Sequence, residues 1–245
     1  MDVAMEWQGP SICAPWNGSC KAGGCMAVLG SFSALAAIAV TAATVGSLHT
    51  LAPDHWVPFA ALARAQRWSA GRTARVTMLC GFGHVTTSVI LGVVALLFGL
   101  ELVATFGHRL ESWGGLLLIA FGLAYGLWGL RRAAGARLHG HVHARYDHVH
   151  NAGNVTPWTL FLLFCADPCV AVIPLVAAAA PFGAVAVGVV ALLYEAATIA
   201  TMTALVLAAW RGATSLRFRW LDQYGDAAAG GLIATLGIVL IHLGW

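Results

Sequence analysis

Six long apolar runs dominate this chain and restrict the folds that are open to it. A helix of about 20 apolar residues crosses a bilayer, and these runs lack the alternation typical of outer-membrane strands. Hydrophobic residues make up 60% and charged residues only 9% of the 245 residues, whereas soluble domains carry roughly 25% charged residues. The sequence therefore predicts an all-α integral membrane protein with six transmembrane helices. They lie near residues 28–50, 76–100, 112–130, 157–180, 183–209 and 227–244.

Basic residues gather in alternate loops between these runs. All 13 Lys and Arg residues except Lys21 and Arg109 follow the first, third or fifth run. Because cytoplasmic loops are enriched in Lys and Arg, we expect these loops inside the cell and both termini outside the cytoplasm. The predicted location is the cytoplasmic membrane, with the lipid bilayer as partner. A net charge of +3 and the lack of any nucleic-acid motif predict no nucleic-acid partner.

Two regions follow from this topology: an extracytoplasmic tail at residues 1–26 and a six-span domain at residues 27–245. The tail contains Cys13, Cys20 and Cys25. Outside the cytoplasm two of these cysteines could form a disulfide. The third cysteine could then stay free. Alternatively, all three cysteines could bind metal.

The first run ends in a cluster of ionisable residues. His49, Asp54 and His55 flank Pro53, and ionisable groups at membrane depth are costly and mark functional sites. In an unbroken helix the two imidazoles would lie roughly 120° apart around the axis. Proline should break the helix, free the His49 carbonyl and let the rings converge. Neutral imidazole and carboxylate suit a divalent transition metal. The next segment, from Trp56, is expected to form a short half-helix at the inner interface.

Further polar residues lie inside the second and fourth runs. His84 is followed by Thr87. His84 could be a metal ligand or the hydrogen-bond partner of a ligand. Alternatively, it is a core histidine bonded to a hydroxyl. In the fourth run, Asp167 precedes Pro168, which should free the Phe164 carbonyl. If the helix continues, Cys165 and Cys169 share one face as a soft-metal or thiol-exchange pair. Ordinary packing is the alternative for both.

The two halves of the chain resemble each other. The fourth run repeats the acid–proline interruption of the first, and the fifth run carries Glu195 with Thr198 three residues later, as the second carries His84 with Thr87. With three spans in each half, the halves would form two inverted repeats. Paired interrupted helices in inverted repeats point to a transport site.

The loop after the third run, residues 131–156, is rich in histidine. Interleaved histidines of this kind indicate a flexible metal-binding tract on the cytoplasmic side. The alternative is a polar linker without function. The histidines are His139, His141, His143, His148 and His150.

Three motifs carry a resemblance to the nickel/cobalt transporter family and its compact efflux and UreH-like relatives. They are His49-x4-Asp54-His55, Gly83-His84-Val85-Thr86-Thr87 and Leu193-Tyr194-Glu195-Ala196-Ala197-Thr198. Glu195 stands where the family has Asp, and Ala52 where the long importers have a further Asp. The Cys169 segment resembles the Pro-Cys stretch of the compact relatives. The resemblance implies transport of nickel or cobalt and leaves its direction open.

The residues and the resemblance together predict a nickel or cobalt permease that is not an enzyme. The metal ion is the transported substrate, no permanent cofactor is expected, and an accessory protein or metallochaperone would be a natural partner. The predicted metal ligands are His49, Asp54, His55 and His84. The predicted supporting or coupling residues are Glu195, Asp167, Thr87, Thr198 and Cys169.

Two rival functions remain open. Cys80 and Cys169 could exchange electrons, as in thiol-transferring membrane proteins of cytochrome-c biogenesis, but that chemistry does not require the histidines. Alternatively, the chain could bind metal as a sensing or delivery subunit without moving it across the membrane.

Overall fold

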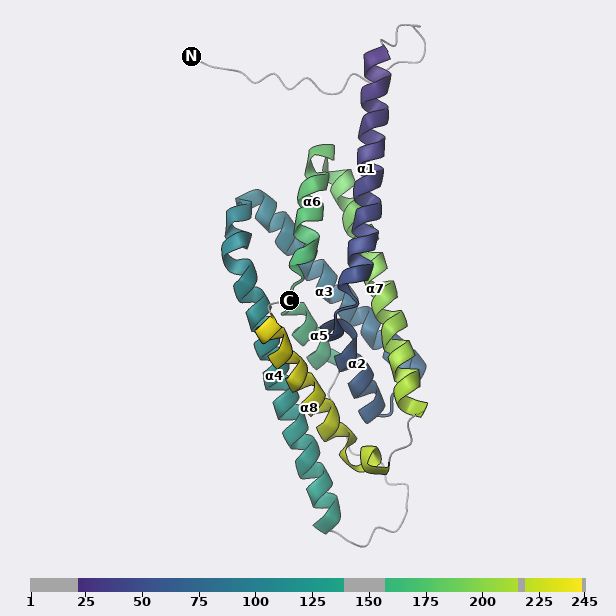
Figure 1. Ribbon diagram of the computed structural model, residues 1–245, viewed down its shortest axis with the longest axis vertical. Helices are drawn as coiled ribbons and strands as arrows, with labels where there is room; N and C mark the ends of the chain where they lie inside the picture. The colour runs from purple at the N-terminus through teal and green to yellow at the C-terminus, as the bar shows by residue number, and fades with distance from the viewer. Residues whose placement is uncertain (1–21, 139–156, 216–218, 244–245) are drawn as a thin grey trace.

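The computed structural model describes residues 22–138, 157–215 and 219–243 (Figure 1). This part of the chain consists of helices joined by short connections and contains no strand, which confirms the predicted all-α class. The elements are α1 (Ala22–His49), α2 (Pro53–Ala65), α3 (Ala70–Phe98), α4 (Leu100–Leu138), α5 (Pro157–Cys165), η1 (Val170–Val172), α6 (Ile173–Ala179), η2 (Ala180–Phe182), α7 (Ala184–Ser215) and α8 (Arg219–Leu243). Cys13, Cys20 and the five histidines predicted to bind metal in the loop lie outside the described residues.

Long apolar helices confirm a multi-pass membrane protein. Within the described ranges, five helices are long and apolar enough to cross a bilayer. A sixth candidate is the bent pair of Pro157–Cys165 and Val170–Phe182, whose two parts meet at 49°. The five unbroken spans are Ser31–His49, Ala70–Phe98, Trp113–Gly135, Ala184–Ser215 and Gln223–His242. The number and position of these segments agree with the apolar runs.

The chain breaks between α1 and α2 where the proline predicts it. α1 ends at His49, and Pro53 occupies the first turn of α2, where its missing N–H costs no hydrogen bond. The His49 carbonyl is not free, however, because the backbone N–H of Ala52 donates to it over 3.1 Å. The His49 carbonyl, which Pro53 leaves without a helical partner, therefore accepts a hydrogen bond within the turn between α1 and α2.

A second break separates α5 from α6. α5 ends at Cys165, and a 3₁₀ turn begins at Val170. Cys165 and Cys169 would share a helix face only in a continuous helix, and this condition is not met because the helix ends before Pro168. In Figure 1 this break and the α1–α2 break lie at a similar level near the middle of the molecule.

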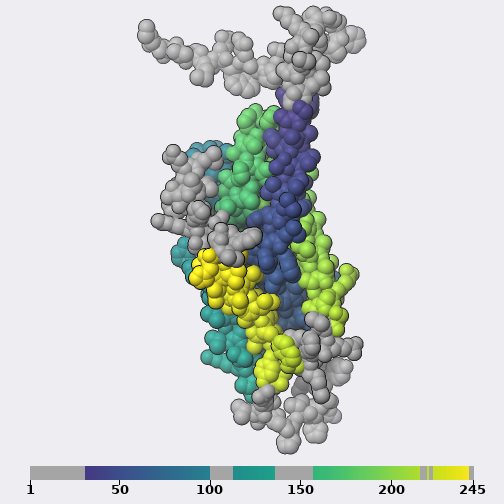
Figure 2. Space-filling view, in the orientation of Figure 1, coloured from purple at the N-terminus to yellow at the C-terminus, as the bar shows by residue number. Residues whose placement is uncertain are grey.

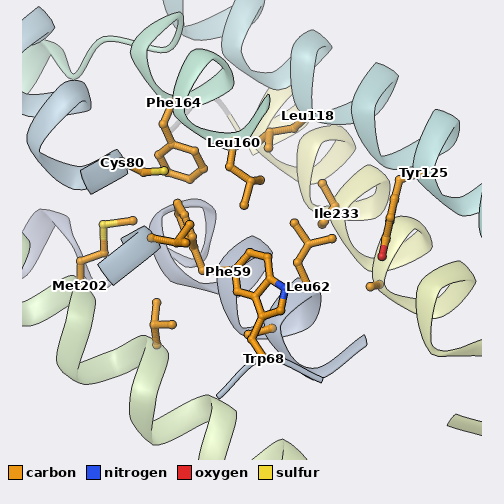
Figure 3. Close-up of a cluster of buried hydrophobic side chains, with 14 residues drawn as sticks. Phe59, Leu62, Trp68, Cys80, Leu118, Tyr125, Leu160, Phe164, Met202 and Ile233 are labelled. Atoms are coloured by element: carbon orange, nitrogen blue, oxygen red, sulfur yellow. The ribbon is translucent and has the colours of Figure 1, made fainter. Parts of the chain in front are cut away.

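The segment after His55 is helical as expected, and it packs into the protein core. Phe59, Leu62 and Ala63 of α2 are completely buried. Figure 3 shows Phe59 and Leu62 among side chains of α4, α5, α7 and α8, including Leu160 and Ile233. These apolar contacts hold α2 inside the bundle. The first turn of α2 is also inside the protein, since His55 is buried.

A second core surrounds α6. It contains Val172 and Val176, together with Val85 of α3 and Tyr194 of α7. Phe164 belongs to the first core and Cys169 to the second. The break between α5 and α6 therefore joins two separately packed cores.

α4 and α8 run side by side along one flank of the molecule (Figure 1). Their backbones are in contact at Gly122 and Gly230, where a Cβ atom would overlap backbone atoms of the opposite helix. Small residues of this kind allow close helix approach in membranes.

α1 stands on the outside of the bundle (Figure 2). Large apolar side chains along it are exposed, among them Phe32 at 68% and Val40 at 67%. Exposed apolar side chains on a spanning helix suit contact with lipid rather than with water.

Candidate metal site

The two helix breaks and α3 enclose a small cavity of about 130 Å³. Polar or ionisable side chains reach it from the end of α1, the start of α2, the middle of α3 and the α5–η1 connection. These residues are His49, Asp54, His55, His84, Asp167 and Cys169. Most of the predicted ionisable residues therefore meet at one place.

Three of these residues come close enough to share one metal ion. One ring nitrogen each of His49 and His84 and the sulfur of Cys169 all lie within 4.8 Å of one another. His84 and Cys169 are buried, with 5% and 6% of their surfaces exposed. Two imidazoles and a thiol form a ligand set suited to a transition metal.

The ring of His84 is held in a defined orientation. Its Nδ1 lies 3.1 Å from the Phe164 carbonyl oxygen, the group that Pro168 was expected to release. A carbonyl only accepts hydrogen bonds, so Nδ1 carries the hydrogen and Nε2 keeps its lone pair. His84 Nε2 is buried and has no hydrogen-bond partner within the described part of the chain. It is the atom of His84 that is free to bind a metal.

Cys169 is fixed through both its backbone and its side chain. Its backbone N–H donates to Ser88 Oγ over 2.7 Å, and the Ser88 hydroxyl donates to the His84 carbonyl over 2.8 Å. Its sulfur lies 3.1 Å from His49 Nε2 and 3.1 Å from the Tyr194 hydroxyl oxygen. Cys169 therefore joins α1, α3 and α7 at the site.

His55 and Asp54 lie beside this group rather than within it. The His55 ring meets the rings of His49 and His84 edge-on, with centroid distances of 4.5 and 5.2 Å. His55 Nδ1 is 3.1 Å from Asp54 Oδ1. These two atoms lack hydrogen-bond geometry, and among the described residues neither they nor His55 Nε2 has another hydrogen-bond partner. Because its ring nitrogens are buried and have no other partner, His55 could bind a metal ion in the same cavity.

The remaining predicted residues occupy other positions. Thr86 Oγ1 donates to Glu195 Oε1 over 3.5 Å, which links α3 to α7. Thr198 Oγ1 donates to the Gly46 carbonyl over 3.5 Å, and Thr87 Oγ1 donates to the Gly83 carbonyl over 2.8 Å. Glu195, Thr87 and Thr198 are not among the residues that line the cavity, whereas Asp167 is.

Sequence reasoning missed two residues of the site. Tyr194 belongs to one of the three motifs without a predicted role, and Ser88 is not among the predicted residues. The spacing of Ser88, four residues after His84, was a usable signal, because residues i and i+4 lie on one helix face. Nothing local to Tyr194 indicated that its hydroxyl meets Cys169.

A larger cavity of about 390 Å³ lies between α2, α7 and α8, away from this site. Its lining is almost entirely apolar, with mostly alanines besides Trp56, Leu232 and Arg64. A lining of this chemistry offers a metal ion no ligands, so the small cavity is the candidate site.

Comparison of the chain with models of protein families, with curated proteins and with solved structures gave no match.

Proposed function

We propose that this chain is a permease that carries a divalent transition-metal ion, nickel or cobalt, across the cytoplasmic membrane. It does so without catalysing a reaction, and the ion is its substrate. The observation that carries the proposal is the convergence of His49, His84 and Cys169 at the meeting point of two interrupted helices.

The chemistry of the site supports an ion as the cargo. Imidazole and thiol ligands bind divalent first-row metals, and the site lies inside a protein with several spanning helices. Asp54 and Asp167 also line the cavity and would balance the charge of a cation. Interrupted helices are typical of substrate sites in secondary transporters.

The choice of nickel or cobalt comes from the motif resemblance. Affinities in such a site follow the Irving–Williams order, so copper and zinc would also bind. Two inverted three-helix repeats, with both termini outside the cytoplasm, belong to this proposal. Alternating movement of the repeats would expose the site to each side in turn.

Cellular accumulation of radiolabelled nickel and cobalt tests the proposal. Native chain is compared with a His49→Ala/His84→Ala variant and with His242→Ala, a control that removes an exposed imidazole near the end of α8. Higher accumulation with native and control chains only would show import, and lower accumulation would show efflux. Equal accumulation in native, variant and empty-vector cells contradicts the proposal.

Flux into vesicles that contain only the purified chain separates transport from binding alone. Native chain should move the ion, and the double variant should not. Binding without flux would favour a sensing or delivery subunit.

Thiol trapping tests the electron-carrier alternative. A bond between Cys80 and Cys169 that responds to redox conditions would support it. These residues belong to different cores, and Cys169 meets His49 and Tyr194 instead.

A further inference from the structure

We propose that Tyr194 is a positioning residue that holds Cys169 as a thiolate ligand, which makes the cargo a thiophilic cation. This inference rests on the metal site of the proposed function and names the class of ion that the site selects. Nickel, cobalt and zinc belong to this class, whereas magnesium and manganese ions of the same charge do not.

The position of Tyr194 supports this role. Its side chain on α7 is fully buried, and its hydroxyl oxygen lies 3.1 Å from the Cys169 sulfur. A buried tyrosine hydroxyl requires a hydrogen-bond partner. When Cys169 binds a metal as a thiolate, its sulfur has no hydrogen to donate, so the Tyr194 O–H becomes the donor.

The backbone of Cys169 is held as firmly as its side chain. Ser88 accepts from the Cys169 N–H, and α3 carries both Ser88 and His84. The sulfur is therefore placed relative to His84 by one hydroxyl and oriented by another. Such partners of metal ligands orient them and tune their donor strength, and their loss typically costs about 10–100-fold in metal affinity.

The sulfur ligand decides which cations are accepted. Thiolate favours metals such as zinc, cobalt and nickel, whereas magnesium and manganese prefer oxygen ligands. Carboxylates are present in the cavity, but Asp54 and Asp167 are not members of the close ligand group. When the metal–sulfur bond forms, the thiol proton passes to water, so the ligand carries one negative charge.

Cobalt titration of the purified full chain in detergent tests the inference. Cobalt bound to thiolate gives a sulfur-to-cobalt charge-transfer absorption band, and its loss in Cys169→Ser assigns it to Cys169 rather than to the other five cysteines of the chain. Native chain should show this band at saturation, and excess Mg²⁺ or Mn²⁺ should not displace the cobalt. Cys169→Ser should lose the band. Tyr194→Phe should keep the band at a shifted energy and bind cobalt about 10–100-fold more weakly.

Tyr125→Phe is the matched control. The Tyr125 hydroxyl donates to Asp226 Oδ1 over 2.6 Å in a separate polar contact between α4 and α8. This variant should reproduce the native band and affinity. An equal change in both tyrosine variants, or an unchanged Tyr194→Phe variant, overturns the positioning role.

The native spectrum is an independent measurement that needs no variant. Cobalt binding without the sulfur band overturns the inference even if Tyr194→Phe does not fold. A native chain that shows a band lost in Cys169→Ser but moves no metal into vesicles would leave the inference intact and remove the proposed function.

Discussion

Individual hydrogen bonds determine how firmly the proposed metal ligands are held. Ser88 is the clearest case, because its hydroxyl accepts from Cys169 on the α5–η1 connection and donates to His84 on its own helix. It is completely buried. The proposed metal site therefore depends on a residue outside the close ligand group.

Replacing Ser88 by Ala should destabilise the protein and weaken cobalt binding. The change leaves the buried N–H of Cys169 without its acceptor, which costs about 1–3 kcal/mol. Thermal unfolding in detergent and the cobalt titration measure the two effects. Thr235→Ala is the control, because its hydroxyl makes the same kind of bond to the carbonyl four residues back but is exposed. Equal unfolding temperatures for both variants would show that the Ser88 bond is not needed.

At the scale of elements, two devices shape the bundle: interrupted helices and close glycine contacts. Pro53 and Pro168 end the helical hydrogen bonding and bring His49 and Cys169 to one cavity. Glycines let α4 and α8 lie with their backbones in contact. The first device serves the site, and the second serves the stability of the scaffold.

Adjacent glycines in α8 allow a sharp test of that contact. A Cβ at Gly230 would overlap backbone atoms of Gly126, whereas a Cβ at Gly231 would meet nothing within 4 Å. Gly230→Ala should therefore force the helices apart and cost about 1–3 kcal/mol. Gly231→Ala should be neutral or stabilise by up to about 1 kcal/mol through helix propensity. Thermal unfolding of the two variants compares them, and equal losses would contradict this packing.

At the scale of the whole molecule, the distribution of basic residues predicts how the chain sits in the membrane. A membrane-impermeant maleimide should label the native chain in intact cells after mild reduction, through Cys13, Cys20 and Cys25. A chain with these three changed to Ser and with Arg145→Cys should be labelled only after permeabilisation, because residues 131–156 are predicted to be cytoplasmic. The same Ser chain without Arg145→Cys is the control for the cysteines inside the spans. Labelling at position 145 in intact cells would reverse the predicted orientation.

Much of the architecture follows from local features of the sequence. Apolar length predicts the spanning segments, and proline predicts both interruptions, because hydropathy and backbone hydrogen bonding act over a few neighbouring residues. The same logic identified Phe164 as a carbonyl that would lose its helical partner. His84 Nδ1 donates to this carbonyl. Before the packing was known, His84 could not be distinguished from a core histidine.

Only the tertiary structure decided which ionisable residues form the close ligand group. It joins His49 and His84 to Cys169, which the sequence placed in a supporting role, and sets Asp54 and His55 beside them. His49 and Cys169 are 120 positions apart in the chain, and Tyr194 comes from yet another helix. The reason is physical: local pattern determines where a helix starts, ends and faces lipid, whereas convergence of ligands depends on how distant helices pack around two cores.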